Sequence, residues 1–256
     1  LYPLLRLILP ASRNGSFVLL SGFLFGFPMG SKNCAEMLKC GQLEYQEAEI
    51  LFMVTNNISP VFISSYILCQ ELHMPSLIPL SYLVIFLPPL IAGRLLFFFT
   101  EKKQSVSNHS TTYKKPASGS QINFKIIDAG IMNGFETLTR LGGYIMLFSI
   151  LSLYLFKLPL PGPDLFKPAL MGFLEITTGI RNICEHASGL SGLLLVTASV
   201  SFGGISGIFQ TRSVLMRNSG RKNAGLSIRH YVLWKLVHAS LSFVLFILLL
   251  RRMPPV

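Results

Sequence analysis

Four short polar or glycine-rich stretches interrupt apolar segments of this 256-residue chain. They read GFPMGSK (26–32), TNNISP (55–60), EITTG (175–179) and GGISG (203–207). Where a membrane helix is broken in this way, its backbone N–H and C=O groups lose their partners and must face protein, a water-filled cavity or a solute. The four interruptions are therefore where the sequence predicts a binding site for a polar solute.

The first interruption combines helix breakers with a cation. Gly26, Pro28 and Gly30 break the apolar run. Ser31 and Lys32 follow, where a second half-helix is expected to begin. The N-terminal end of a half-helix carries partial positive charge and attracts anions. Ser31 and Lys32 are therefore predicted to hold a carboxylate, and the alternative is a packing kink with Lys32 extended to the membrane interface.

The second interruption is rich in amide side chains. Asn56, Asn57 and Ser59 come together just before Pro60. Such groups are costly in hydrocarbon unless they are hydrogen-bonded. They are expected either to bind the solute or to satisfy the backbone groups that Pro60 frees, and the sequence leaves both roles open.

The third interruption supplies a carboxylate. Glu175 ends an apolar half-helix, and Thr177, Thr178 and Gly179 follow at the break. Because ionisable residues inside a membrane are usually functional, Glu175 is predicted to bind a proton, a sodium ion or a donor group of the substrate. The alternative is an internal ion pair with Arg181 or with a lysine elsewhere.

The fourth interruption is built from glycines. Gly203, Gly204 and Gly207 form the break, and Ser206 and Gln210 are the candidate ligands beside it. The alternative is that the glycines only allow close packing of helices.

Two further polar pairs lie at helical spacing. Lys235 and His238 are three residues apart on the last apolar segment, where pairing at the membrane interface is favoured over a proton relay. Glu136 and Arg140 are four apart, which predicts a salt bridge.

The composition indicates that these residues are held by membrane-spanning helices. The chain is 51% hydrophobic and 13% charged, with mean hydropathy +0.55, whereas soluble domains carry about 25% charged residues. An all-α integral membrane protein is therefore predicted. The net charge of +11 is spread between apolar runs, so membrane lipid and a small anionic solute are the expected partners rather than nucleic acid. A homo-oligomer is left open.

Soluble-enzyme signatures are missing from the sequence. It has no P-loop, HExxH motif, GxSxG elbow or Rossmann fingerprint. No enzymatic activity, cofactor or metal site is therefore expected. Coupling of transport to H⁺ or Na⁺ is left open.

The apolar segments suggest two halves. Counted as single passes, they are 15–40, 44–72, 76–99, 125–156, 168–186, 190–219 and 230–250. A polar basic linker at 100–124 would separate a first repeat, 1–99, from a second, 125–256. LFGFPMGSKN (24–33) and SFGGISGIFQ (201–210) share three identities at an offset of 177, and on this count they run in opposite directions. Two inverted repeats are therefore predicted.

Longer stretches around these motifs resemble a known family. They are SGFLFGFPMGSKNCAEML, EAEILF and TNNISPVFI in the first half, and TLTRLGGYIMLFSIL, GFLEITTGI and SFGGISGIFQ in the second. They are similar to sporulation integral membrane proteins of the YlbJ type, within the nucleoside recognition or Gate domain group. The positions that match its motifs are Gly26, Pro28, Gly30, Lys32, Asn56, Ser59, Pro60, Glu175, Thr177 and Gly179.

The resemblance implies a multi-pass, transporter-like fold with two Gate-type repeats and broken helices. The first repeat is expected to lack its N-terminal part, because the family's apolar N-terminal portion has no counterpart here. The resemblance further implies movement of dipicolinic acid during sporulation, in the cell membrane or outer forespore membrane of a spore-forming bacterium. A nucleoside-type transporter of the same architecture and a non-transporting sporulation scaffold are the alternatives.

Overall fold

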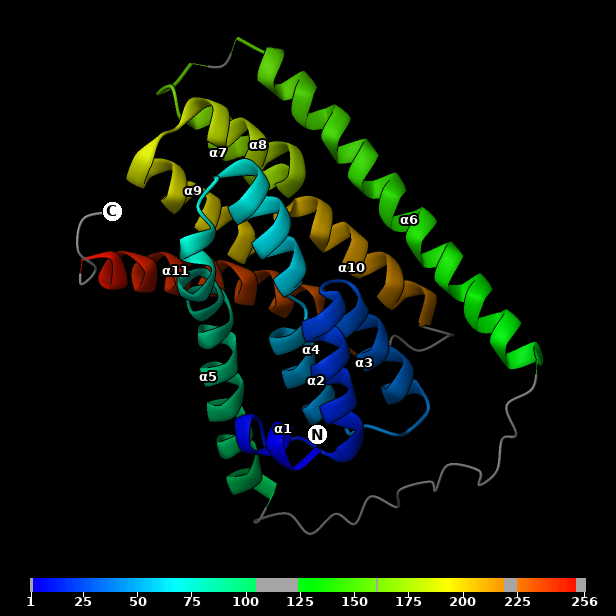
Figure 1. Ribbon diagram of the computed structural model, residues 1–256. Coiled ribbons are helices and arrows are strands. Elements are labelled where there is room, and N and C mark those ends of the chain that lie inside the picture. The colour runs from blue at the N-terminus through cyan, green and yellow to red at the C-terminus, as the bar shows by residue number, and fades with distance from the viewer. Residues whose placement is uncertain (1, 105–123, 160, 219–224, 252–256) are drawn as a thin grey trace.

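The structure is a computed structural model that describes residues 2–104, 124–159, 161–218 and 225–251 (Figure 1). All regular secondary structure in these ranges is helical. The prediction of an all-α chain is therefore confirmed for the part that is described. Of the predicted linker, residues 105–123 lie outside the described ranges, while residues 100–104 continue helix α5 (Ile78–Gln104).

Four helical segments are long and apolar enough to cross a membrane. They are Pro75–Phe99, Phe124–Lys157, Gly189–Met216 and Ile228–Leu250. A fifth span results if α1 (Tyr2–Ile8) and α2 (Arg13–Phe25), bent by 80°, count as one. Length and composition thus support a multi-pass helical membrane protein.

Residues 15–40 form a helical hairpin and not the single pass that the hydropathy predicted. Helix α3 (Met29–Lys39) folds back along α2, so that Asn33 Nδ2 donates to Ser21 Oγ at 2.7 Å. A Cβ atom on Gly22 would lie only 3.1 Å from Gly30 Cα. The small residues let the two arms close, and residues 26–28 form the hairpin tip.

Residues 168–186 form a second hairpin, from α7 (Phe166–Leu174) and α8 (Ile176–His186). Gly172 and Gly179 bring its arms together, since a Cβ atom on Gly179 would lie 2.2 Å from Gly172 Cα. Glu175 stands between the arms, as C-cap of α7 and N-cap of α8. The prediction of inverted repeats counted each of these two segments as one pass, so that count does not apply to the structure.

Each hairpin is followed by a helix with a break. Residues 56–61 separate α4 (Tyr45–Thr55) from the π-helical segment η1 (Phe62–Glu71), and Gly203 separates α9 (Gly189–Phe202) from α10 (Gly204–Asn218). The predicted pairing of 24–33 with 201–210 joins a hairpin tip to a helix break, so the structure does not show these two segments as counterparts. By position in each half, the GFPMG tip corresponds to the Glu175 tip, and TNNISP corresponds to GGISG.

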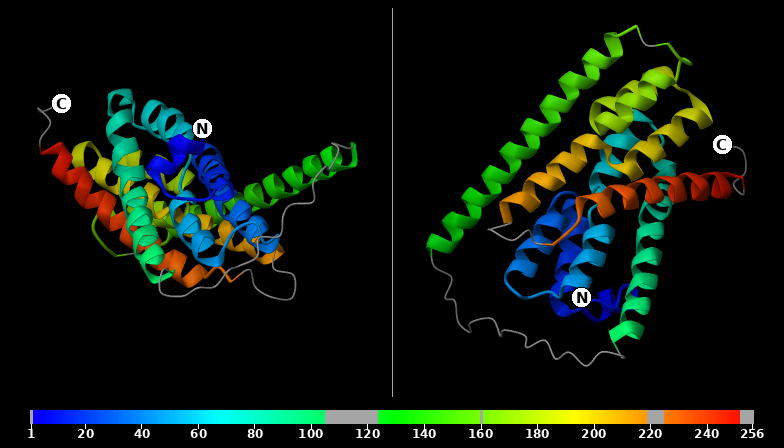
Figure 2. Two further views of the ribbon diagram at one scale, coloured as in Figure 1. Left: turned by 90° about the horizontal axis from the view of Figure 1, so that it is seen from below. Right: turned by 180° about the vertical axis from the view of Figure 1, so that it is seen from behind.

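The remaining long helices frame these elements. Helix α6 (Phe124–Lys157) runs along the outside of the molecule, against α7, α8 and α10 (Figures 1 and 2). Helix α11 (Ile228–Leu250) crosses α5 and packs along α9, and it also reaches α4 (Figure 1). The two breaks thus lie between an outer helix and a crossing helix.

Candidate functional site

Both hairpin tips and both helix breaks border one cavity of about 190 Å³. Six of the predicted site residues line it, and they come from all four interruptions: Gly26, Ser59, Glu175, Thr177, Gly207 and Gln210. Seven apolar residues complete the wall: Phe25, Phe27, Ile58, Phe62, Leu141, Ile145 and Ile176. The cavity is therefore an apolar chamber with a small polar side.

Sequence reasoning missed the apolar part of this wall. Phe25, Phe27, Ile58 and Ile176 directly adjoin the predicted motifs, so their position beside a break was a usable signal. Leu141 and Ile145 on α6 carry no such signal, because nothing in a plain apolar helix marks which turn faces a distant motif.

Phe27 anchors the first tip. Its backbone N–H donates to Asn57 O at 2.7 Å, which ties the tip to the first break. Its ring packs on the second break, because a Cβ atom on Gly207 would lie 3.1 Å from a ring carbon. A larger residue at position 207 would therefore require the ring to shift by a few tenths of an ångström.

The second tip packs on the same break. A Cβ atom on Gly204 would lie 3.3 Å from Ile176 Cγ2 and 3.5 Å from Leu174 O. The glycines of GGISG therefore do serve helix packing, as one alternative held, and Gly207 lines the cavity as well.

Glu175 is the charged residue of the cavity wall and is 1% exposed. Its Oε2 atom accepts hydrogen bonds from Thr178 N at 2.9 Å, Thr178 Oγ1 at 2.7 Å and Ser149 Oγ at 3.4 Å, and also from Thr177 Oγ1. Across the described ranges, nothing donates to Oε1. Among the residues that the structure describes, Glu175 forms neither of the alternative ion pairs, with Arg181 or with a lysine. Arg181 pairs instead with Glu185 at 3.1 Å.

Two other polar groups remain available at the wall. Gln210 Nε2 donates to Ser206 Oγ at 3.0 Å, and Ser59 Oγ accepts from Phe62 N at 3.2 Å. These bonds leave Gln210 Oε1 as an acceptor and the Ser59 hydroxyl as a donor. Together with Glu175 Oε1, they can bind a solute that both donates and accepts hydrogen bonds.

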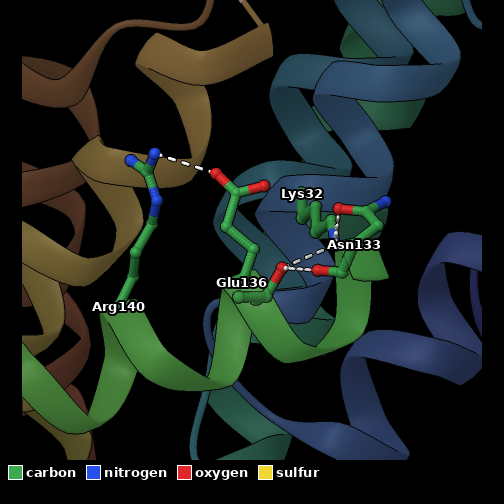
Figure 3. Close-up of polar contacts among 5 residues, drawn as sticks. Lys32, Asn133, Glu136 and Arg140 are labelled. Carbon is green, nitrogen blue, oxygen red and sulfur yellow. Dashed lines mark hydrogen bonds and ion pairs between the residues drawn. The ribbon is translucent and has the colours of Figure 1, made fainter. Parts of the chain in front are cut away.

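Lys32 and Ser31 do not line the cavity. Lys32 Nζ donates to Asn133 Oδ1 at 3.1 Å and to Thr137 Oγ1 at 2.9 Å, both on α6 (Figure 3). Lys32 is 7% exposed, so it links α3 to α6 inside the protein rather than reaching outward. Helix α3 already begins at Met29, so Ser31 lies in its first turn, and Ser31 Oγ donates to Pro28 O at 2.7 Å.

The predicted salt bridge on α6 is confirmed. Glu136 Oε1 lies 2.9 Å from Arg140 Nη2, and Figure 3 shows the Glu136 side chain turned toward Arg140.

The amides of the first break bind protein. Asn56 Nδ2 donates to Thr211 Oγ1 at 2.9 Å and to Tyr231 OH at 2.7 Å. Asn57 Nδ2 donates to Val54 O at 2.7 Å. Neither amide donates to the carbonyl that Pro60 frees, Asn56 O, which accepts from Tyr231 OH at 3.4 Å, and of this motif's predicted ligands Ser59 lines the cavity.

The other predicted residues support the tips and breaks without lining the cavity. They are Pro28, Gly30, Thr178, Gly179, Gly203, Gly204 and Ser206. Lys235 and His238 are 1% and 0% exposed, and among the described residues they do not form the predicted pair. Each has its own partner, Lys235 Nζ bonding Asn57 Oδ1 at 3.1 Å and His238 Nε2 bonding Ile85 O at 2.8 Å.

The chain resembles one curated protein at low identity. No family model matches it, and no solved structure matches it. It is 26% identical over 248 residues to Sporulation integral membrane protein YlbJ of Bacillus subtilis (strain 168). The match covers 84% of this chain and 60% of that relative, so the chain spans about three-fifths of the protein it matches. The chain is therefore similar to a YlbJ-type protein, the resemblance that the sequence motifs predicted.

Proposed function

We propose that the chain forms the solute-binding part of a membrane transporter or channel for a small organic anion, most specifically dipicolinic acid during sporulation. The observation that carries the proposal is the meeting of two hairpin tips and two helix breaks around one cavity. Broken helices are tolerated at membrane depth where they line a cavity or bind a solute. The name of the similar protein, a sporulation integral membrane protein, supports the sporulation setting.

The wall of the cavity suits a small, flat, aromatic solute. Its volume of about 190 Å³ is below the roughly 300–1,000 Å³ of pockets for drug-sized ligands. Phe25, Phe27 and Phe62 offer ring faces and edges, and Ser59 and Gln210 offer hydrogen bonds. Dipicolinic acid combines one aromatic ring, which suits the phenylalanines, with two carboxyl groups, which suit the hydrogen-bonding side chains.

The polar side of the cavity would require a proton to accompany a bound carboxylate. Glu175 lies in the wall, whereas no lysine or arginine is among the described residues that line it. Two neighbouring carboxylates repel each other unless a proton lies between them. The bound acid and Glu175 would therefore share a proton, which makes H⁺ the expected companion of the solute.

Opening would occur at the tips. Phe27 rests on Gly207, and Ile176 rests on Gly204, so each tip seals against the α9–α10 break. Movement of one tip at a time away from the break would expose the cavity first to one side of the membrane and then to the other.

Uptake by the full protein in liposomes tests the proposal. Labelled dipicolinate should enter protein-containing vesicles faster than empty ones, and faster with an inward H⁺ gradient. Glu175→Gln should abolish the effect of the gradient, because Gln cannot share the proton. Glu136→Gln, on the outer face of α6, is the matched control and should transport normally. Equal flux in empty and protein-containing vesicles would refute the proposal.

A nucleoside-type transporter is the second candidate. It is favoured by the same observation, because a carboxylate and an amide line the cavity while its described wall holds no cation. Such groups bind sugar hydroxyls and base edges well. Unlabelled uridine or adenosine should then compete with uptake, and saturating nucleoside without any effect would exclude this candidate.

A further inference from the structure

Lys235 on α11 is a buried cation without an acidic partner. The residue is 1% exposed, and its Nζ donates to Asn57 Oδ1 at 3.1 Å. In the parts of the chain that the structure describes, it forms no ion pair with a carboxylate. Burying an ammonium is costly unless other groups compensate its charge, so something else must stabilise it here.

Two helix C-termini provide this compensation. Asn57 lies two residues beyond the end of α4, and Gly203 is the C-cap of α9. A Cβ atom on Gly203 would lie 3.4 Å from Lys235 Cε and 3.7 Å from Nζ, so the ammonium lies beside both ends. Each helix C-terminus carries about half a negative charge, so both ends favour a cation beside them.

Two neighbours of Lys235 on α11 donate hydrogen bonds to carbonyls at the C-terminal end of α4. Trp234 Nε1 donates to Met53 O at 3.0 Å, and Tyr231 OH donates to Asn56 O at 3.4 Å. These carbonyls have no partner inside a helix that stops at Thr55. Helix α11 thus donates to two main-chain carbonyls at this end of α4, and Lys235 adds a charged donor to the Asn57 side chain just beyond it.

The chemistry of this place is that of a cation site. In transporters with broken helices, half-helix C-termini and unwound carbonyls commonly bind the coupling Na⁺. We propose that the Lys235 ammonium is a tethered cation that occupies the place of such an ion between α4 and α9. The protein then needs no Na⁺ to hold the first break, and it binds none there.

The position links the cation to the hairpin tip. Asn57 accepts from Lys235 through its side chain, and its backbone C=O accepts from Phe27 N at 2.7 Å. Removing the cation should therefore loosen the first break and the tip together. The consequence for transport, that solute moves without Na⁺, rests on the proposed function, whereas occupancy of the site does not.

The test is thermal unfolding of the full protein in detergent, without solute, followed by circular dichroism. Wild type should unfold at the same temperature in sodium chloride and in choline chloride of equal strength. Lys235→Ser should unfold at least about 5 °C lower in choline and recover in sodium in a saturable way. Lys235→Met, which fills the space with an apolar chain, should not recover.

Lys32→Ser is the matched control, because Lys32 is also buried but bonds side chains of α6. Lys32→Ser should lower the unfolding temperature by the same amount in sodium chloride and in choline chloride. Na⁺-specific stabilisation of wild type would overturn the proposal. The proposal would also be overturned if Lys235→Ser unfolded at the same lowered temperature in both salts, or were unfolded in both. Because no solute is present, these outcomes are independent of whether dipicolinate is transported.

Discussion

The close approach of α7 and α8 makes Gly179→Ala the sharpest test of the hairpin. A Cβ atom at this position would lie 2.2 Å from Gly172 Cα, 2.4 Å from Gly172 N and 2.6 Å from Met171 C. All three neighbours are backbone atoms, so no side-chain rotation can relieve the contact. To reach an ordinary 3.4 Å, the arms must separate by about 1.2 Å (3.4 minus 2.2).

The size of the effect follows from this displacement. Overpacking a well-packed interior costs about 1–3 kcal/mol, and contact with backbone alone places Gly179→Ala near about 3 kcal/mol. For a chain of this size, that corresponds to a Tm lowered by about 6–12 °C. The loss outweighs the roughly 0.5–1 kcal/mol that alanine gains over glycine inside a helix.

Trp234, the one tryptophan of the chain, provides the assay, because it is half-buried and hydrogen-bonded on α11. Its emission should shift when the detergent-solubilised protein unfolds on heating. Gly142→Ala on α6 is the control, since a Cβ atom there meets nothing within 4 Å, and it should leave Tm unchanged or slightly raised. Gly179→Ala unfolding at the same temperature as Gly142→Ala would refute the hairpin packing.

Two further predictions concern the break and the crossing helix. Gly207→Ala should reduce uptake, because its Cβ would lie 3.1 Å from a ring carbon of Phe27 and displace the ring. Adding Phe27→Leu should restore part of the uptake, and a double variant without any recovery would contradict this contact. Ser242 Oγ donates to Val84 O at 3.0 Å, so Ser242→Ala should lower the free energy of unfolding by about 1–3 kcal/mol in thermal melts. Ser240→Ala, an exposed control, should cost under about 0.5 kcal/mol, and equal losses would argue against the Ser242 contact.

The Ser242 contact has a specific cause in α5. Pro88 and Pro89 lie inside this helix and cannot donate to the carbonyls four residues earlier, Val84 O and Ile85 O. Ser242 Oγ and His238 Nε2 donate to these two carbonyls. The buried histidine therefore has a structural role that its spacing to Lys235 did not indicate.

The hairpins show what hydropathy cannot distinguish. A stretch of 20 or more residues with a break has the same apolar content whether it crosses the membrane or turns back. The second arms did hold a signal: α3 carries Lys32 and Glu36, and α8 carries Arg181 and Glu185. Charged arms of 11 residues are poorly suited to finish a crossing through lipid.

The predicted anion site at Lys32 shows a similar limit. Lys32 follows the first break, and the sequence alone placed its charge beside a solute there. In the folded chain the break lies at a hairpin tip and α3 leads away from it, so the ammonium meets α6 instead (Figure 3). Lys235, distant in sequence, is the cation that reaches a break, through Asn57.

The sequence by itself determined the class of protein and the four interruptions, because apolar content and helix-breaking residues are local properties. It also predicted six of the residues that line the cavity. The tertiary structure alone decided which interruptions are hairpin tips, which polar groups face the cavity, and which groups Lys32 and Lys235 contact. These depend on contacts between residues more than 100 positions apart, such as Lys32 with Thr137 and Asn57 with Lys235, and no local pattern encodes them.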